Sequence, residues 1–195
     1  NVETDEVQGS GKNVGKSVME VPRLNTKIRY WEYYDLQETF DQLFTQSKNG
    51  KKFYQLYELI ISENNILLAY RTIKANKGSS TPGTDSFTID NYKEMNQAEF
   101  IHLILSQLEN YKPKSIKRVM IPKPNGEKRP LGIPCMIDRI IQQMFKQVLE
   151  PICEAKFYEH SYGFRPLRSA KHALGRIMYL INISKMHYAV DIDID

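Results

Sequence analysis

The sequence predicts an α+β fold that is rich in helices and carries one short, basic β-hairpin. Apolar residues recur at helical spacing over most of the chain, and two short runs of strand-forming residues flank an Asn-Gly pair. The last residues alternate between apolar and acidic side chains, as strand residues do. With 195 residues and 41% hydrophobic content, the chain can bury a sizeable core.

Helices are expected to fill the chain before the hairpin. The apolar stripes that predict them are Leu36–Phe44, Phe53–Ile60, Ile66–Ile73 and Phe100–Leu108. Ser62 is the expected N-cap of the third helix, and Gly78 is its expected stop. Lys77–Asp85 then reads as a loop, because Gly, Ser, Thr and Pro dominate it.

The hairpin is expected over residues 115–134, with strands at Lys117–Ile121 and Arg129–Ile133. Asn125-Gly126 between them is the strongest short-range signal for a hairpin. Residues 112–129 carry a net charge of +6, so the rest of the chain carries −2 of the total of +4. Such a ribbon can lie along phosphate groups, and prolines at 122, 124, 130 and 134 favour a rigid one. Charge alone leaves an ordinary solvated hairpin open as well.

Two further helices and a strand are expected after the hairpin. The stripes Ile137–Val148 and Ala170–Ile181 predict the helices, and Tyr188–Asp195 predicts the strand. Cys135 and Cys153 have no Cys or His neighbour at metal-ligand spacing, so we expect both to be buried free thiols.

Asp191, Asp193 and Asp195 form the first candidate for a chemical site. On a strand their carboxylates would share one face and repel each other unless a cation lay among them. Oxygen ligands of this kind select Mg²⁺, which many phosphoryl-transfer enzymes use. An exposed acidic strand end is the alternative, and the residues alone do not decide between the two.

Ser161–Ser169 is the second candidate. Tyr162 and Phe164 offer aromatic faces, and Arg165 and Arg168 lead into a helix, so the segment could hold a sugar or a phosphate. Equally, the aromatic residues could belong to the core and Arg165 could be a structural ion-pair partner. The residue types leave both interpretations open.

The composition argues against a membrane protein. No apolar run approaches the roughly 20 residues of a membrane helix, and the first residues lack the apolar stretch of a signal peptide. We therefore expect a cytoplasmic protein, in a bacterial cytosol or an organelle interior, with no membrane partner.

A series of longer strings runs through the chain. They are ANKGSSTPGTDSFTID (75–90), IPKPNGEKRPLGIP (121–134), DRIIQQ (138–143), HSYGFRPLRSA (160–170) and YAVDIDI (188–194). In order and spacing they resemble the N-terminal half of group II intron-encoded reverse transcriptases, also called maturases. The resemblance covers about residues 30–195 and implies a right-hand polymerase fold, of which this chain supplies the fingers and the first palm strand.

This resemblance divides the chain into four parts. Residues 1–25 form a flexible N-terminal segment, and 26–111 form a helical N-terminal extension and fingers with a template-gripping loop at 77–86. Residues 112–186 complete the fingers and include the hairpin, and 187–195 form a truncated first palm strand. The family's Tyr-x-Asp-Asp motif does not occur, so we expect the chain to be part of a longer protein and inactive by itself.

The resemblance also implies roles for single residues. Asp193 matches the first catalytic, metal-binding aspartate, with the backbone of Ile194 beside it, and Asp191 is the competing register. The positions that match contacts to the incoming nucleotide are Lys123, Arg129, Phe164 and Arg165. Those expected to contact nucleic acid are Lys77, Gly78, Ser79, Lys112, Lys114, Lys117, Arg118, Lys128 and Arg168.

The implied function is RNA-directed DNA synthesis by Mg²⁺-dependent nucleotidyl transfer, with binding of intron RNA to assist splicing and mobility. The implied partners are dNTPs, a template–primer of RNA and DNA, and group II intron RNA, and a homodimer is a further option. Two alternatives stay open: a non-catalytic module that binds structured RNA, and a related bacterial reverse transcriptase that serves defence or diversity generation.

Overall fold

The computed structural model describes residue 32 and residues 34–192. The elements in this part are, in order, α2 (Gln37–Lys48), α3 (Leu56–Ile60), α4 (Glu63–Ala75), η1 (Lys77–Ser80), η2 (Ile89–Tyr92), α5 (Gln97–Glu109), β1 (Lys117–Pro122), β2 (Lys128–Ile133), α6 (Met136–Glu154) and α7 (Ala170–Asn182). Helices together with one two-stranded antiparallel sheet agree with the expected α+β class. Segment 1–25 and the residues Asp193 and Ile194 lie outside the described residues.

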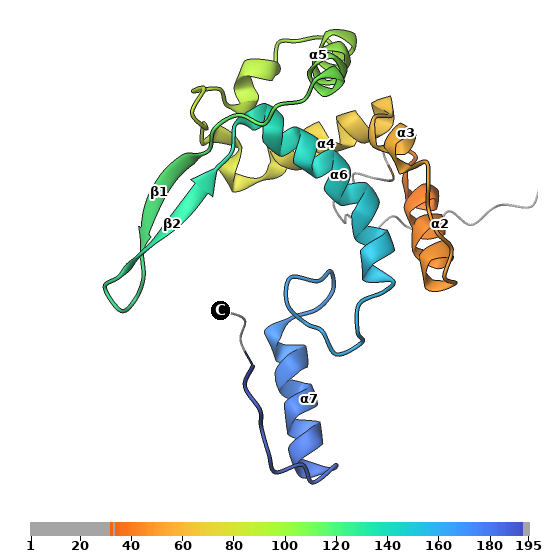
Figure 1. The fold of residues 1–195 in the computed structure, drawn as a ribbon, viewed down its shortest axis with the longest axis vertical. Helices are drawn as coiled ribbons and strands as arrows, with labels where there is room; N and C mark the ends of the chain where they lie inside the picture. The colour runs from red at the N-terminus through yellow and green to blue at the C-terminus, as the bar shows by residue number, and fades with distance from the viewer. Residues whose placement is uncertain (1–31, 33, 193–195) are drawn as a thin grey trace, which may run out of the picture.

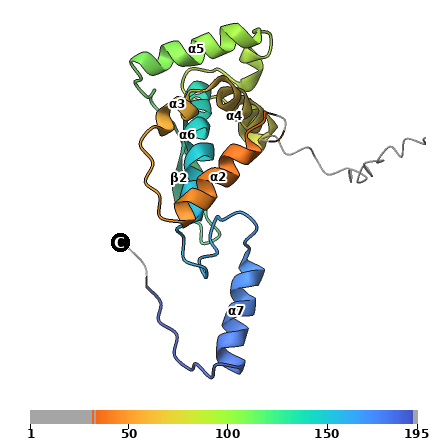
Figure 2. The same ribbon diagram turned by 90° about the vertical axis from the view of Figure 1, so that its right-hand side faces the viewer.

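Helix α6 runs through the middle of the helical body and packs against α2, α3 and α4 (Figures 1 and 2). Four residues spaced four apart, Met136, Ile140, Met144 and Val148, are fully buried, because that spacing keeps side chains on one helical face. Helix α5 lies beside α4, where the ring of Phe100 contacts those of Tyr70 and Tyr92 at centroid distances of 5.0 and 6.1 Å. No helix within residues 34–192 is both long and apolar enough to cross a membrane.

Buried polar side chains fix the position of α6 against its neighbours. The amide nitrogen of Asn65 on α4 donates to the carbonyl oxygens of Ile60, at 2.8 Å, and of Met144, at 3.2 Å. Gln147 on α6 donates to the backbone oxygen of Asn65 at 2.7 Å, and Ser47 on α2 donates to Ile152 O at 2.8 Å. Since such groups are costly to bury without partners, these bonds restrict how α6 can pack.

The end of α4 differs from the expectation. The helix stops at Ala75 because Asn76 adopts an extended backbone with ψ of 142°, and Lys77–Ser80 form the 3-10 turn η1. Gly78 is therefore not the helix stop but a residue of this turn. Ser62 stands at the N-cap as expected, yet its hydroxyl donates to Leu59 O at 2.8 Å rather than capping the helix.

The basic hairpin forms as predicted and projects from the helical body (Figure 1). Val119 pairs with Leu131 in the middle of the ribbon, and Pro122 with Lys128 at its outer end. Gly126 has a φ of +85°, and its N–H donates to Lys123 O at 3.1 Å. This pattern is a type I turn followed by a left-handed residue, for which glycine is suited.

The last part of the chain is less packed than the sequence suggests. Helix α7 forms as predicted but has no buried residue, and it lies at the opposite end of the molecule from α5 (Figures 1 and 2). Residues 188–192 form no strand, because a strand needs a hydrogen-bonding partner and β1 and β2 pair only with each other among the described residues. Cys135 is buried as expected, but Cys153 is exposed, which corrects the prediction of two buried thiols.

Replacing the core asparagine Asn65 by Ala should destabilise the fold. The change removes the buried donor to Ile60 O and Met144 O, and the Gln147 amide keeps only the backbone oxygen of residue 65 as an acceptor there. We therefore expect the free energy of unfolding in urea to fall by about 2–4 kcal/mol. Asn64→Ala, at an exposed position on the same helix, is the matched control and should change it by less than about 0.5 kcal/mol. Equal effects of the two variants would contradict the role assigned to the Asn65 bonds.

Candidate nucleic-acid interface

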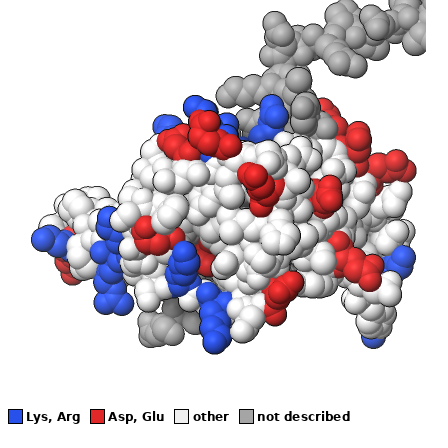
Figure 3. Space-filling view, turned by 90° about the horizontal axis from the view of Figure 1, so that it is seen from above, with Lys and Arg blue, Asp and Glu red and all other residues white. Residues whose placement is uncertain are grey.

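The hairpin carries exposed cations on both of its faces. Cross-strand partners share a face, so the register places Lys117 and Arg129 on one face and Arg118 and Lys128 on the other. All four residues are exposed, and so are Lys112 and Lys114, which precede the ribbon. Figure 3 shows Lys and Arg gathering toward the side of the molecule where Figure 1 places the hairpin, whereas acidic side chains spread over the rest.

Lys123 at the tip of the hairpin is engaged by a carboxylate. Its ammonium lies 3.0 Å from Glu127 Oε2, and the same oxygen accepts a bond from the Asn125 amide at 3.1 Å. The hydrogen bond from Lys123, followed by that from Asn125, holds the pKa of the Glu127 carboxyl below its usual range. An anion that binds Lys123 must therefore compete with an ionised glutamate, although solvent screens this exposed pair.

The loop Lys77–Asp85 lies directly against the start of α6. A Cβ atom at Gly83 would stand 2.7 Å from the Cα and 2.8 Å from the N of Cys135, so only glycine fits there. Next to it, the Thr84 hydroxyl donates to Ser115 O at 2.8 Å and lies 3.3 Å from the Cys135 sulfur. The loop is therefore docked on the body and on the base of the hairpin, although it contains hardly any apolar residue.

An ion pair adds a second link between loop and hairpin. Lys114 Nζ lies 3.1 Å from Oδ2 of Asp85, and the other carboxylate oxygen of Asp85 accepts a bond from the N–H of Phe87 at 3.2 Å. Burial alone raises the pKa of Asp85, but the bonds from Lys114 and Phe87 outweigh it and leave the pKa below its usual value. The Asp85 carboxylate is thus ionised and bound to Lys114 at neutral pH.

Asp138 in the first turn of α6 is a buried carboxylate that binds the segment leading into the hairpin. It accepts a bond from the Tyr111 hydroxyl at 2.8 Å and one from the Lys114 N–H at 3.2 Å. Burial, together with the bond and charge of Asp138, raises the pKa of Tyr111 to about 12. The N-terminal position in α6 also favours a negative charge, because the helix dipole is positive there.

Arg139, the next residue, binds the loop. Its Nη1 donates to Gly78 O at 2.8 Å, its Nη2 to Thr81 O at 2.7 Å, and its Nε to Pro134 O at 2.9 Å. The DRIIQQ string contains Asp138 and Arg139, but the sequence alone predicts no role for either residue. An Asp-Arg pair at the start of an amphipathic helix was the available signal, but its partners lie far away in the sequence.

The guanidinium of Arg165 is engaged by hydrogen bonds within the molecule. Its guanidinium donates to Glu154 Oε1 at 2.7 Å and to the carbonyl oxygens of Tyr158 and Ser161 at 2.8 and 3.0 Å, and its side chain is only 8% exposed. This geometry favours the structural ion pair over direct nucleotide contact. Phe164 beside it is fully exposed at a φ of +55°, so it is not a core residue. Arg168 lies 5.7 Å above the ring of Tyr162.

The acidic candidate is only partly described. Asp191 is exposed, and Asp193 and Ile194 lie outside the described residues. Within residue 32 and residues 34–192, no group of three or more His, Cys, Asp or Glu side chains is arranged to hold a metal ion. The structure therefore brings the loop and the hairpin together but gives no geometry for the expected Mg²⁺ site.

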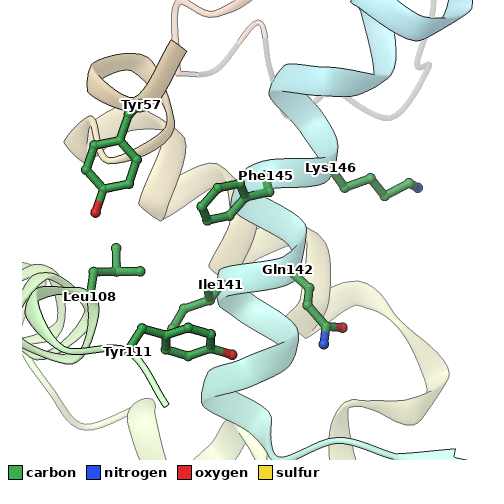
Figure 4. Close-up of a pocket in the computed structure, with 7 residues that line it drawn as sticks. All are labelled: Tyr57, Leu108, Tyr111, Ile141, Gln142, Phe145 and Lys146. Atoms are coloured by element: carbon green, nitrogen blue, oxygen red, sulfur yellow. The ribbon is translucent and has the colours of Figure 1, made fainter. Parts of the chain in front are cut away.

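An apolar pocket of about 510 Å³ lies apart from these cations, between α3, α5 and α6 (Figure 4). Tyr57, Leu108, Ile141 and Phe145 surround its space, whereas the ammonium of Lys146 extends away from it. Such a lining does not suit a phosphate group. The loop and hairpin, rather than this pocket, are the candidate interface for a polyanion.

Comparison with known proteins gives one family. Residues 121–195 match the reverse transcriptase (RNA-dependent DNA polymerase) family. The match begins inside β1 and includes the hairpin tip, α6 and α7.

Individual relatives extend the similarity toward the N-terminus. Protein YkfC of Escherichia coli is 40% identical over 62% of this chain and 32% of its own length. The group II intron-encoded protein LtrA of Lactococcus lactis is 37% identical over 72% of this chain and 22% of its own length. The putative COX1/OXI3 intron 1 protein of Saccharomyces cerevisiae is 30% identical over 81% and 19%. The chain thus spans a third or less of these relatives.

Gly83→Ala should disturb the docking of the loop. The added methyl group would meet backbone atoms of Cys135, so we expect the free energy of unfolding to fall by roughly 1–3 kcal/mol. Gly78→Ala in the same loop is the control, because a Cβ there would meet nothing within 4 Å. Urea titrations of both variants measure the difference, and an unchanged midpoint for Gly83→Ala would show that the loop does not pack this closely.

Proposed function

We propose that this chain is part of an RNA-directed DNA polymerase encoded by a group II intron, because residues 121–195 match the reverse transcriptase family and the chain is similar to an intron-encoded protein. The protein copies RNA into DNA and binds its intron RNA to assist splicing and mobility. In this proposal residues 26–111 form a helical N-terminal extension and part of the fingers, residues 112–186 complete the fingers, and residues 187–195 begin the palm.

The joined loop and hairpin are the observation that supports this proposal most. The hairpin exposes cations on both faces, and the loop is fixed to its base by Thr84 and by the Lys114–Asp85 pair. A basic surface on a rigid support suits a phosphate backbone, because the cations are already in place when the nucleic acid arrives. We assign the template contacts to Lys77–Ser79 and to the hairpin cations.

The incoming nucleotide is assigned to Lys123 and Arg129. Arg129 pairs with Ile121, and Lys123 follows Ile121 by two residues at the start of the turn, which supports a shared ligand for the two cations. Phosphate oxygens would replace Glu127 as the partner of Lys123. Arg165 acts behind this site, where its bonds to Glu154 and to two carbonyl oxygens support the turn that displays Phe164.

Asp193, with the backbone of Ile194, is assigned to the catalytic metal. The family match supports dependence on a divalent metal in general, and carboxylate oxygens suit Mg²⁺. When bound, such an ion would stabilise the charge that develops on the phosphoryl oxygens during nucleotidyl transfer. The task of the described residues is to hold the template and the triphosphate in place for that step.

Neutralising the hairpin should weaken RNA binding in a salt-dependent way. Changing Lys117, Arg118 and Lys128 to Gln removes three phosphate partners, so the slope of log affinity against log salt should become shallower by about 2–3. Filter binding of a template RNA measures this slope. Changing the exposed residues Lys48, Lys51 and Lys52 to Gln alters the net charge equally and is the matched control. A similar loss in the control would refute a specific interface at the hairpin.

Asp193→Asn in the full-length protein should abolish DNA synthesis on an RNA template. The amide keeps the size of the side chain but loses the charge that a divalent ion requires, so we expect a loss of at least about a hundredfold in kcat. Asp191→Asn is the matched variant and should keep most of the activity. The opposite result would move the site to Asp191, and splicing assistance with no DNA synthesis in the unmodified protein would favour the non-catalytic RNA-binding module.

A further inference from the structure

We propose that Arg139 is a positioning residue that clamps the loop Lys77–Asp85 to the base of the hairpin, so that loop and hairpin meet RNA as one preformed surface. This inference rests on the proposed function, because it gives the loop a task in RNA binding. Arg139 itself contacts no RNA in this proposal. Its effect on binding passes entirely through the position of the loop.

The geometry of Arg139 carries the first step of the argument. Its three hydrogen bonds end on backbone oxygens of two segments. Gly78 O and Thr81 O belong to the loop, and Pro134 O belongs to the short connection between β2 and α6. The bonds are 2.7–2.9 Å long, as expected when a charged donor is involved. Because backbone oxygens accept them, the clamp fixes the path of the chain rather than one side chain.

Arginine suits this task and lysine does not. A guanidinium is planar and presents its N–H groups in fixed directions, which lets one side chain reach three acceptors at once. A lysine would keep the charge but could satisfy at most part of this set. Arg139→Lys therefore separates the clamp from the simple effect of a positive charge.

The first half of the loop depends on such a clamp, because the other contacts described above, those of Gly83, Thr84 and Asp85, hold only its second half. It contains no buried large apolar residue. The Gly78 oxygen accepts the Thr81 N–H at 3.0 Å as well as Arg139 Nη1, so the clamp and the η1 turn share an atom. Losing the clamp should therefore open the turn itself.

Asp138 makes the clamp part of a pair. It binds the segment that leads into the hairpin, through Tyr111 and the Lys114 N–H, while its neighbour Arg139 binds the loop. Both residues lie in the first two turns of α6, and the apolar face of this helix is buried in the core. One rigid helix end thus sets the distance between the two parts of the interface.

Hydrogen exchange on the RNA-free Arg139→Lys protein tests the clamp directly. We expect the amides of Ser79 and Thr81, which bond to oxygens within the turn, to exchange roughly tenfold faster than in the unmodified protein. The amides of α5 should keep their rates. Arg176→Lys on α7 makes the same side-chain change away from the loop and should alter neither region.

Binding of an RNA template annealed to a DNA primer is the second readout. Arg139→Lys should raise the dissociation constant about tenfold and make its salt dependence shallower by about 1, because contacts made by the loop are lost. Arg176→Lys should bind as the unmodified protein does.

Each outcome decides the proposal. Unchanged exchange at Ser79 and Thr81 would overturn the clamp, and so would equal acceleration in α5, which would indicate general destabilisation. Faster exchange of the loop with unchanged RNA affinity would overturn its role in RNA binding. That last result would leave the hairpin part of the proposed function standing, because the Lys117, Arg118 and Lys128 variant tests it independently.

Discussion

The first turns of α6 are the constraint on which the interface depends. The core fixes this helix through apolar contacts and through the buried amides of Asn65 and Gln147. Their hydrogen bonds between α4 and α6 form in only one relative position of the two helices. From that fixed end, Asp138 and Arg139 hold the chain on either side. The two candidate contact regions are therefore placed by the core of the body, although neither contributes much to that core.

Local signals were enough for the helices and for the hairpin. Apolar periodicity predicted α2, α4, α5, α6 and α7, and Asn125-Gly126 predicted the turn between β1 and β2. The docking of the loop could not be predicted in this way. Arg139 reaches oxygens 58 and 61 residues earlier in the chain, and Gly83 meets Cys135 across a similar separation. Composition shows that a loop lacks apolar residues, but it does not show which distant polar group replaces them.

The last part of the chain shows why alternation of side chains does not by itself make a strand. Tyr188, Val190 and Ile192 alternate with other residues as predicted, yet their backbone groups have no ladder partner among the described residues, and their side chains are exposed. Helix α7 forms nonetheless, because its hydrogen bonds lie within the segment itself. A helix can thus be predicted from its own sequence, whereas a strand also depends on a second segment.

The pleat of the hairpin divides its positive charge between two faces. A net +6 in one stretch suggests a single patch, but the register sends Lys117 and Arg129 to one face and Arg118 and Lys128 to the other. A ribbon two strands wide cannot turn both faces toward one phosphate group. Lys123, at the turn beyond the strand that carries Ile121 opposite Arg129, already pairs with the carboxylate of Glu127. The face with Arg129 therefore suits a small anionic ligand that can displace Glu127 from Lys123. On the opposite face, Arg118 and Lys128 form no ion pair with any carboxylate in the described part of the chain. That face is the one better suited to a long backbone that crosses the ribbon.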